Sequence, residues 1–254
     1  MLRIRYRDEN GVQSGTVDSP EELDAYDLLI PVEPPEVWCA GVTYKRSRDA
    51  RIEEAVVKDI YSLVYEAERP EFFLKDAAGR RTVGPGETIG VRSDSAWSVP
   101  EPEIALVLGE GGRIDGVTIG NDVSSRDIEG TNPLYLPQAK IYAGSCALGP
   151  AVLTEWEGPF EIRLRILEDG RELFAGETST AQMQRSFEDL VDWLSRENPV
   201  PPGSVLLTGT GLVPPDEFNL QPGHVVEIEV PGIGTLRNPV GAAADLVTRR
   251  SETR

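Results

Sequence analysis

Short runs in which apolar and polar residues alternate dominate the chain, and this period of two is typical of β-strands. At the start, Leu2, Ile4 and Tyr6 alternate with polar residues before the turn sequence ENG, which predicts a hairpin over residues 1–20. Beyond residue 80, runs rich in Val, Ile and Leu are separated by the turn sequences GPGETI, LGEGGRIDG, LEDGREL and QPGHVVEIEVPGIGTL. Most of the chain is therefore predicted to be β-structure.

Two segments have helical spacing instead. Over residues 47–68, apolar residues recur every three or four positions, namely Ile52, Val56, Ile60, Leu63 and Val64. The sequence RPEFFLK is expected to end this helix and begin a strand. A second helix is predicted over 180–196 from the stripe Met183, Phe187, Leu190 and Leu194, with NPVPPG ending it. Helices and strands do not alternate regularly, so we expect an α+β fold that is mainly β with a few flanking helices.

A proline-rich passage divides the chain. EELDAYDLLIPVEPPEVW precedes the segments described above and is the best candidate for a seam between an N-terminal appendage and the main body. We predict a small N-terminal region over 1–70, made of hairpin, linker and helix, and a catalytic domain over 71–254.

Charge and composition narrow the function. The net charge of -18 argues against nucleic-acid or anionic membrane partners, which require basic surfaces. No apolar run approaches a membrane span and the first residues lack a signal-peptide core, so we expect a cytoplasmic protein. Cys39 and Cys146 are too few for a disulfide framework and are expected to be packing residues. The acidic, lysine-poor composition fits high-salt adaptation and a genome bias equally well.

The sequence VPEPEIALVLG carries two carboxylates at the head of an apolar strand. Glu101 and Glu103 are two residues apart, so both side chains point to one face of a strand. Downstream, the run GVTIGNDVSSRD ends on Asp122, a third carboxylate at a strand end. Three carboxylates suit a hard divalent ion, Mg²⁺ first and Mn²⁺ or Ca²⁺ next. The alternative is that the glutamates, each preceded by proline, protect an exposed edge strand.

Further polar residues are candidates for substrate binding. Gln138 and Lys140 precede a strand-like segment with the same two-residue spacing, and a partly desolvated lysine beside a metal could carry a proton or bind a carboxylate. In VLLTGTG, backbone N–H groups and the hydroxyls of Thr208 or Thr210 could hold an anion. Lys75 is a further candidate substrate-binding residue. The single histidine, His224, has no nucleophile nearby, and no nucleotide-binding glycine motif occurs.

Together these segments resemble the fumarylacetoacetate hydrolase superfamily. The matching stretches, in the family's order over residues 39–240, are GVTY, RPEFFLK, VGPGETI, EPEIALVLG, GVTIGNDVSSRD, PQAKIYAGSCALGP, LLTGTG and LQPGHVVEIEVPGIGTLRNPV. The resemblance implies a mixed β-sheet roll or barrel, Mg²⁺ bound by Glu101, Glu103 and Asp122, and Lys140 near the metal. It also implies a homodimer or homotetramer.

One departure from the family pattern indicates a branch. Members that hydrolyse carbon–carbon bonds carry a histidine and a glutamate where this chain has Ser47 and Ala50, so the usual water-activating pair is missing. The stretches GVTYKRSRDARIEE, RSDSAWSVPEPE and SSRDIEGTNPLYLPQAKIYAGSCALGP resemble the branch that contains the 2-keto-3-deoxy-D-arabinonate dehydratases.

That branch implies dehydration of a 2-keto-3-deoxy-pentonate to 2,5-dioxopentanoate through a metal-stabilised enolate. Lys140 is expected to bind or polarise the 2-oxo acid, and Glu53 or Glu54 to supply the other proton-transfer group. Arg126 either clamps a substrate carboxylate or pairs with Asp127 or Glu129.

Several alternatives to this reaction stay open. The first is an acylpyruvate-type hydrolase or oxaloacetate decarboxylase, which would break a carbon–carbon bond. The second is a Schiff-base dehydratase that uses Lys140, and the third is a non-catalytic sugar-acid binder. The sequence does not determine the stereochemistry or chain length of the substrate, or which group removes the proton.

Overall fold

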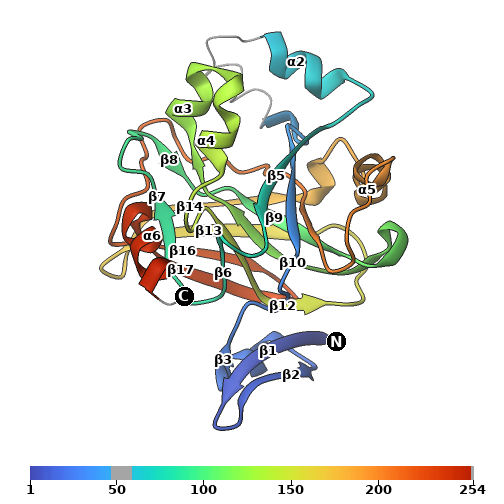
Figure 1. The fold of residues 1–254 in the computed structure, drawn as a ribbon, viewed down its shortest axis with the longest axis vertical. Helices are drawn as coiled ribbons and strands as arrows, with labels where there is room; N and C mark the ends of the chain where they lie inside the picture. The colour runs from blue at the N-terminus through green and yellow to red at the C-terminus, as the bar shows by residue number, and fades with distance from the viewer. Residues whose placement is uncertain (47–58, 253–254) are drawn as a thin grey trace.

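The computed structural model describes residues 1–46 and 59–252, and in this part of the chain strands far outweigh helices (Figure 1). The strands are β1 (Leu2–Asp8), β2 (Gly11–Val17), β3 (Asp27–Leu28), β4 (Glu36–Gly41), β5 (Glu71–Ala77), β6 (Thr82–Val83), β7 (Ile89–Val91), β8 (Ser98–Val99), β9 (Pro102–Leu108), β10 (Ile114–Asp122), β11 (Ser124–Ser125), β12 (Cys146–Leu153), β13 (Glu161–Glu168), β14 (Arg171–Ser179), β15 (Val205–Leu207), β16 (His224–Val230) and β17 (Gly234–Ala242). The α+β fold that is mainly β, predicted from the alternation, is confirmed.

Most of these strands form two sheets. The larger sheet has ten strands in the order β2-β1-β12-β10-β9-β15-β4-β5, with β3 and β6 attached to β1 and β12. It is mixed, because β15 runs parallel to β4 and antiparallel to β9. A five-stranded sheet has the order β14-β13-β16-β17-β7, and β8 pairs with β11.

Strand β9 lies in the interior of the larger sheet and is buried on both faces. Ile104, Leu106 and Leu108 belong to the main hydrophobic cluster, which also includes residues of the five-stranded sheet. The intervening Ala105 and Val107 belong to a second cluster. A strand covered on both faces needs apolar residues at every position. This burial explains the unbroken apolar run IALVL.

The N-terminal hairpin is confirmed. Leu2 pairs with Val17 and Asp8 with Gly11, and β1 also pairs with β12 of the body through Leu2 and Leu153. Figure 1 shows β1, β2 and β3 projecting below the rest of the molecule. Strand β4 precedes residue 70 in the chain but lies inside the larger sheet. The predicted boundary between an N-terminal region over 1–70 and a catalytic domain over 71–254 stays a prediction.

The helices are short and lie around the sheets. They are α2 (Asp59–Glu66), α3 (Arg126–Thr131), α4 (Leu136–Lys140), α5 (Phe187–Ser195) and α6 (Ala243–Glu252), with 3-10 turns at Pro20–Ala25, Glu110–Gly112, Pro133–Tyr135 and Thr180–Gln182. Helix α5 starts later than the predicted residue 180, because the Ser186 hydroxyl caps it by accepting from the N–H of Asp189 at 3.1 Å. The predicted helix over 47–68 includes α2, and the rest of that prediction falls outside the described residues.

Two predicted properties can be compared with the fold. Cys39 and Cys146 are free and buried, and burial raises the pKa of both thiols, to about 12 for Cys146. They are therefore packing residues, as expected. Within 1–46 and 59–252, no helix is long and apolar enough to cross a membrane.

Asp76 organises the turn that follows β5. Its buried carboxylate accepts hydrogen bonds from the backbone N–H groups of Ala77, Arg80, Arg81 and Thr82, from the Thr82 hydroxyl and from the Arg81 guanidinium. We expect Asp76→Asn to lower the free energy of unfolding by about 3 kcal/mol, because an amide NH₂ would face these donors. Urea denaturation measures the loss.

Asp94→Asn is the matched control for this prediction. Asp94 pairs with Arg92 at the surface, where its side chain is 63% exposed, so the loss there should stay below about 1 kcal/mol. Equal losses in the two variants would contradict the role given to Asp76.

Candidate active site

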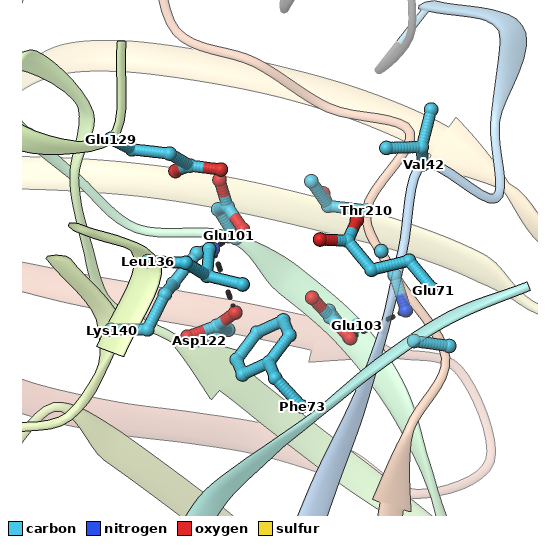
Figure 2. Close-up of a pocket in the computed structure, with 13 residues that line it drawn as sticks. Val42, Glu71, Phe73, Glu101, Glu103, Asp122, Glu129, Leu136, Lys140 and Thr210 are labelled. Carbon is cyan, nitrogen blue, oxygen red and sulfur yellow. Dashed lines mark hydrogen bonds and ion pairs between the residues drawn. The ribbon is translucent and has the colours of Figure 1, made fainter. Parts of the chain in front are cut away.

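Glu101, Glu103 and Asp122 converge because β9 and β10 are neighbouring antiparallel strands. Glu103 pairs with Gly120 in their register, and the N–H of Asp122 donates to the Glu101 carbonyl at 3.0 Å. One carboxylate oxygen from each of the three residues lies within 4.8 Å of the others, and all three side chains are buried (Figure 2). The shared face predicted from the two-residue spacing is confirmed. The edge-strand alternative is wrong, since β9 lies between β10 and β15.

The buried carboxylates of Glu101, Glu103 and Asp122 repel one another when they are ionised. Burial, followed by the charges of Asp122 and Glu101, raises the pKa of Glu103 well above its ordinary value. The Gly209 N–H and the Lys140 ammonium act in the opposite direction. Cationic partners are therefore required around this cluster.

Lys140 provides one of these partners. Its Nζ donates to Glu101 Oε2 at 2.7 Å, to Asp122 Oδ2 at 2.8 Å and to Ser124 Oγ at 2.5 Å. Lys140 is the last residue of α4, which precedes strand β12, so the two-residue spacing of Gln138 and Lys140 falls on a helix. Residues two apart on a helix face different directions. The Gln138 side chain is accordingly exposed and does not line the cavity.

Lys75 contacts the cluster but is absent from the cavity wall. Its fully buried Nζ forms an ion pair with Asp122 Oδ1 and donates to the carbonyls of Val123 and Lys140 at 3.1 and 2.5 Å. Lys75 thus holds Asp122 and the end of α4, and its placement gives no support to direct substrate binding.

Arg126 is also buried and pairs with Glu101 Oε1 at 2.9 Å. The carboxylate of Asp127 instead accepts from the Ser95 hydroxyl and the Ala96 N–H, both at 2.7 Å. Sequence analysis did not foresee the pairing of Arg126 with Glu101. It places the guanidinium on a metal-site carboxylate rather than on the wall of the cavity.

The VLLTGTG loop holds an anion, as its composition suggested, but that anion is Glu103. The Gly209 N–H donates to Glu103 Oε2 at 2.6 Å. The Thr208 hydroxyl donates to the Ile104 carbonyl at 2.9 Å and so fixes the loop to β9, whereas Thr210 lines the cavity.

A cavity of about 20 Å³ lies over the cluster, with room for roughly one water-sized particle. Its wall includes Glu71 and Phe73, which the sequence did not indicate, and Glu129, which was expected only as a possible partner of Arg126. Figure 2 shows Lys140 and Asp122 on one side and Glu71 with Thr210 on the other. Glu53 and Glu54, the predicted proton-transfer residues, and Ser47 and Ala50 lie outside the described residues.

The residues present fit a divalent cation. All three converging ligand atoms are carboxylate oxygens, the donors that Mg²⁺ prefers. Among the residues that the structure describes, the cations Lys75, Arg126 and Lys140 contact the three carboxylates.

Comparison with known proteins identifies the family of this chain. Residues 36–241 match the family model of the fumarylacetoacetate (FAA) hydrolase C-terminal domain, and the chain belongs to this family. It is 49% identical over 227 residues to the 2-dehydro-3-deoxy-D-arabinonate dehydratase of Saccharolobus solfataricus, which covers 86% of this chain and 76% of that protein. It is 52% identical over 215 residues to a Haloferax volcanii protein named "Probable 2-keto-3-deoxyxylonate dehydratase", covering 83% of this chain and 74% of that one.

A solved structure is also similar. It is a 2-keto-3-deoxy-D-arabinonate dehydratase complexed with magnesium and 2,5-dioxopentanoate, with a TM-score of 0.80 and 42% identity. The match covers 91% of this chain and 83% of that one.

Gly209 offers a test of the loop that supports Glu103. Its φ is +90°, and an added Cβ would lie 2.1 Å from Thr43 Oγ1 and 3.0 Å from the Ala40 carbonyl oxygen. We expect Gly209→Ala to displace the N–H from Glu103 and weaken Mg²⁺ binding about 10- to 100-fold, as measured by calorimetry.

Gly170→Ala separates this effect from backbone strain. Gly170 has a similar φ of +79° but open space around it, so its variant should lose about 1 kcal/mol of stability and bind Mg²⁺ normally. Unchanged Mg²⁺ affinity in Gly209→Ala would contradict the proposed support of Glu103.

Proposed function

We propose that this protein is a Mg²⁺-dependent dehydratase that converts a 2-keto-3-deoxy-pentonate to 2,5-dioxopentanoate. One observation carries the proposal: Glu101, Glu103 and Asp122 form a buried carboxylate cluster in direct contact with Lys140. The two relatives named as dehydratases, each about half identical to this chain, support the same reaction.

The reaction removes a C3 proton and the C4 hydroxyl of the substrate as one water, which leaves a C3=C4 double bond beside the 2-keto group. Loss of a C5 proton and return of a proton to C3 move this double bond to C4=C5, and the enol so formed at C5 tautomerises to the aldehyde. Bound at the three carboxylates, Mg²⁺ would supply a Lewis acid that withdraws charge from the 2-keto group and makes the C3 proton acidic. The protein's own task is to orient the substrate and to carry these protons.

Lys140 and Glu71 suit this task because they approach the cavity from opposite sides (Figure 2). Lys140 can exchange one of its three hydrogen bonds for one to the substrate's carboxylate or keto oxygen, and Glu71 can accept the C3 proton. Thr210 lies on the same side as Glu71 and can orient a substrate hydroxyl. Phe73 covers the aliphatic part of the space and keeps water away from the reacting carbons.

The size of the cavity limits how the substrate binds. About 20 Å³ accommodates an ion rather than a five-carbon acid. The 2-oxo acid end would therefore reach the cluster while the rest of the substrate extends outward from the cavity.

Product analysis tests the proposed reaction. Purified protein with Mg²⁺ is incubated with a panel of 2-keto-3-deoxy-pentonates, acylpyruvates and oxaloacetate, and the products are identified by mass. We expect a five-carbon product that lacks one water relative to the pentonate. Two smaller fragments would indicate hydrolysis or decarboxylation instead. Thermal stabilisation by the acid without any product would indicate a sugar-acid binder.

We also propose a homodimer or homotetramer located in the cytoplasm, with a small 2-oxo acid as the ligand and neither nucleic acid nor membrane as a partner. The charge of -18 and the family's implied assembly support this view. Sedimentation velocity tests the assembly.

A further inference from the structure

Gly41, the last residue of β4, lies directly opposite Glu71, the first residue of β5, in the antiparallel register of the two strands. Both residues line the cavity, and both belong to the end of the larger sheet where β5 is the outermost strand. Side chains of such cross-strand pairs normally stand beside each other. Because position 41 is a glycine, no side chain stands opposite Glu71 in this pair.

The glutamate occupies the space that a side chain at position 41 would need. A Cβ added to Gly41 would lie 2.1 Å from Glu71 Oε2, 2.8 Å from Cδ and 3.3 Å from Cγ, and these are the three nearest atoms. Each of these distances is shorter than ordinary van der Waals contact. The Glu71 carboxylate therefore lies across the bare backbone of β4.

We propose that Gly41 is a positioning residue, whose missing side chain allows the Glu71 carboxylate to cross β4 and reach the cavity. The proposal rests on the proposed function, in which Glu71 carries the C3 proton. Figure 2 shows the carboxylate of Glu71 beside Thr210 and on the same side as Glu103. Any larger residue at position 41 would push this carboxylate away from the reacting carbon.

Gly41 can be replaced without disturbing the strand itself. Its φ lies outside the left-handed region, so alanine can adopt the same backbone conformation. The three nearest atoms all belong to one flexible side chain, and that side chain can rotate. Gly41→Ala should therefore move Glu71 and leave the carboxylates of Glu101, Glu103 and Asp122 in place.

A double-mutant cycle provides the test. We expect Gly41→Ala to lower kcat/KM for the pentonate about 10- to 100-fold, because small displacements of a reacting group have effects of this size. The Kd for Mg²⁺, measured by calorimetry, should stay within about twofold, and the Tm within a few degrees. In a Glu71→Ala background, Gly41→Ala should cause no further loss, because the side chain that it displaces is already gone.

Gly15→Ala is the matched control. Gly15 also lies in a strand, and an added Cβ would meet only Tyr6 Cε1 at 3.5 Å, an ordinary contact. This variant should keep wild-type kcat/KM. Wild-type kcat/KM in Gly41→Ala, or an equal further loss in the Glu71→Ala background, would overturn the proposal.

A measurement that does not need dehydration distinguishes failure of the role of Gly41 from failure of the proposed dehydratase activity. Exchange of the methyl protons of pyruvate with D₂O, followed by ¹H NMR, reports proton abstraction beside a keto group. If the wild-type protein exchanges these protons but does not dehydrate pentonates, the proposed function fails. The role of Gly41 is then tested by measuring the exchange rate, in place of kcat/KM, in the variants of the double-mutant cycle. If it does neither, a crystal structure of Gly41→Ala decides. An unmoved Glu71 carboxylate would overturn the positioning role, and a displaced one would support it.

Discussion

Glu103→Gln is expected to abolish Mg²⁺ binding and turnover while leaving the fold intact. Glutamine keeps an oxygen that can accept from the Gly209 N–H, so the loop contact survives. It removes one of the three charges that attract the ion. Calorimetry should show Mg²⁺ affinity lowered more than about 100-fold, beyond the effect typical of residues that only support a ligand.

The same variant should be at least as stable as the wild type when metal is absent. Burial raises the pKa of Glu103 in the folded protein, so its ionisation costs stability as the pH rises through that pKa. The neutral side chain escapes this cost. Metal-free Tm at neutral pH should therefore be equal or higher, and the rise in Tm on adding Mg²⁺ should disappear.

Glu110→Gln is the matched control, because Glu110 is exposed in the turn after β9. Its variant should bind Mg²⁺ and turn over normally. Full activity of Glu103→Gln at limiting Mg²⁺ would show that this carboxylate is not a metal ligand.

Lys140→Met is expected to differ from Glu103→Gln in both metal-free stability and Mg²⁺ binding. The ammonium contacts Glu101, Asp122 and Ser124, so its loss leaves two buried carboxylates short of a cation. Metal-free Tm should fall, and Mg²⁺ should restore more stability than it gives the wild type. We expect kcat to fall by about 10²- to 10⁴-fold, the range for loss of a proton-transfer group, while Mg²⁺ binds at least as tightly.

The control for this variant is Lys45→Met, since Lys45 is exposed and does not line the cavity. Loss of Mg²⁺ binding in Lys140→Met would make Lys140 a support of the metal site alone. Unchanged kcat would remove it from the reaction altogether.

The carboxylate cluster could be predicted because its geometry is local. Glu101 and Glu103 share a face through the two-residue period of a strand, and Asp122 ends the next strand along the chain. Neighbouring antiparallel strands then bring these positions together. The alternation of apolar residues likewise predicted the hairpin and the mainly β body.

The surroundings of the cluster were harder to predict. The sequence LPQAK forms the short helix α4, which was not predicted, and Pro137 in its first turn was the available signal. The sequence RPEFFLK was predicted to begin a strand, but the shared direction of its alternate side chains was not used to predict site residues. Glu71 and Phe73 line the cavity and Lys75 contacts Asp122, at three alternating positions of β5.

The contact between β5 and the cluster depends on long-range order in the sheet. Strand β4 pairs in parallel with β15, more than 160 residues later, and this pairing carries β5 to the site. The ion pair between Arg126 and Glu101 also depends on tertiary packing, because the two residues are 25 positions apart in the chain.

Metal-dependent dehydration by the wild-type protein is the most direct test of the account. The protein is stripped with a chelator, and release of 2,5-dioxopentanoate from a 2-keto-3-deoxy-pentonate is followed as Mg²⁺ is added back. We predict no release before addition and a rate that saturates as Mg²⁺ fills the Glu101, Glu103 and Asp122 site. Release at full rate without a divalent ion, or none at any Mg²⁺ concentration, would contradict the account.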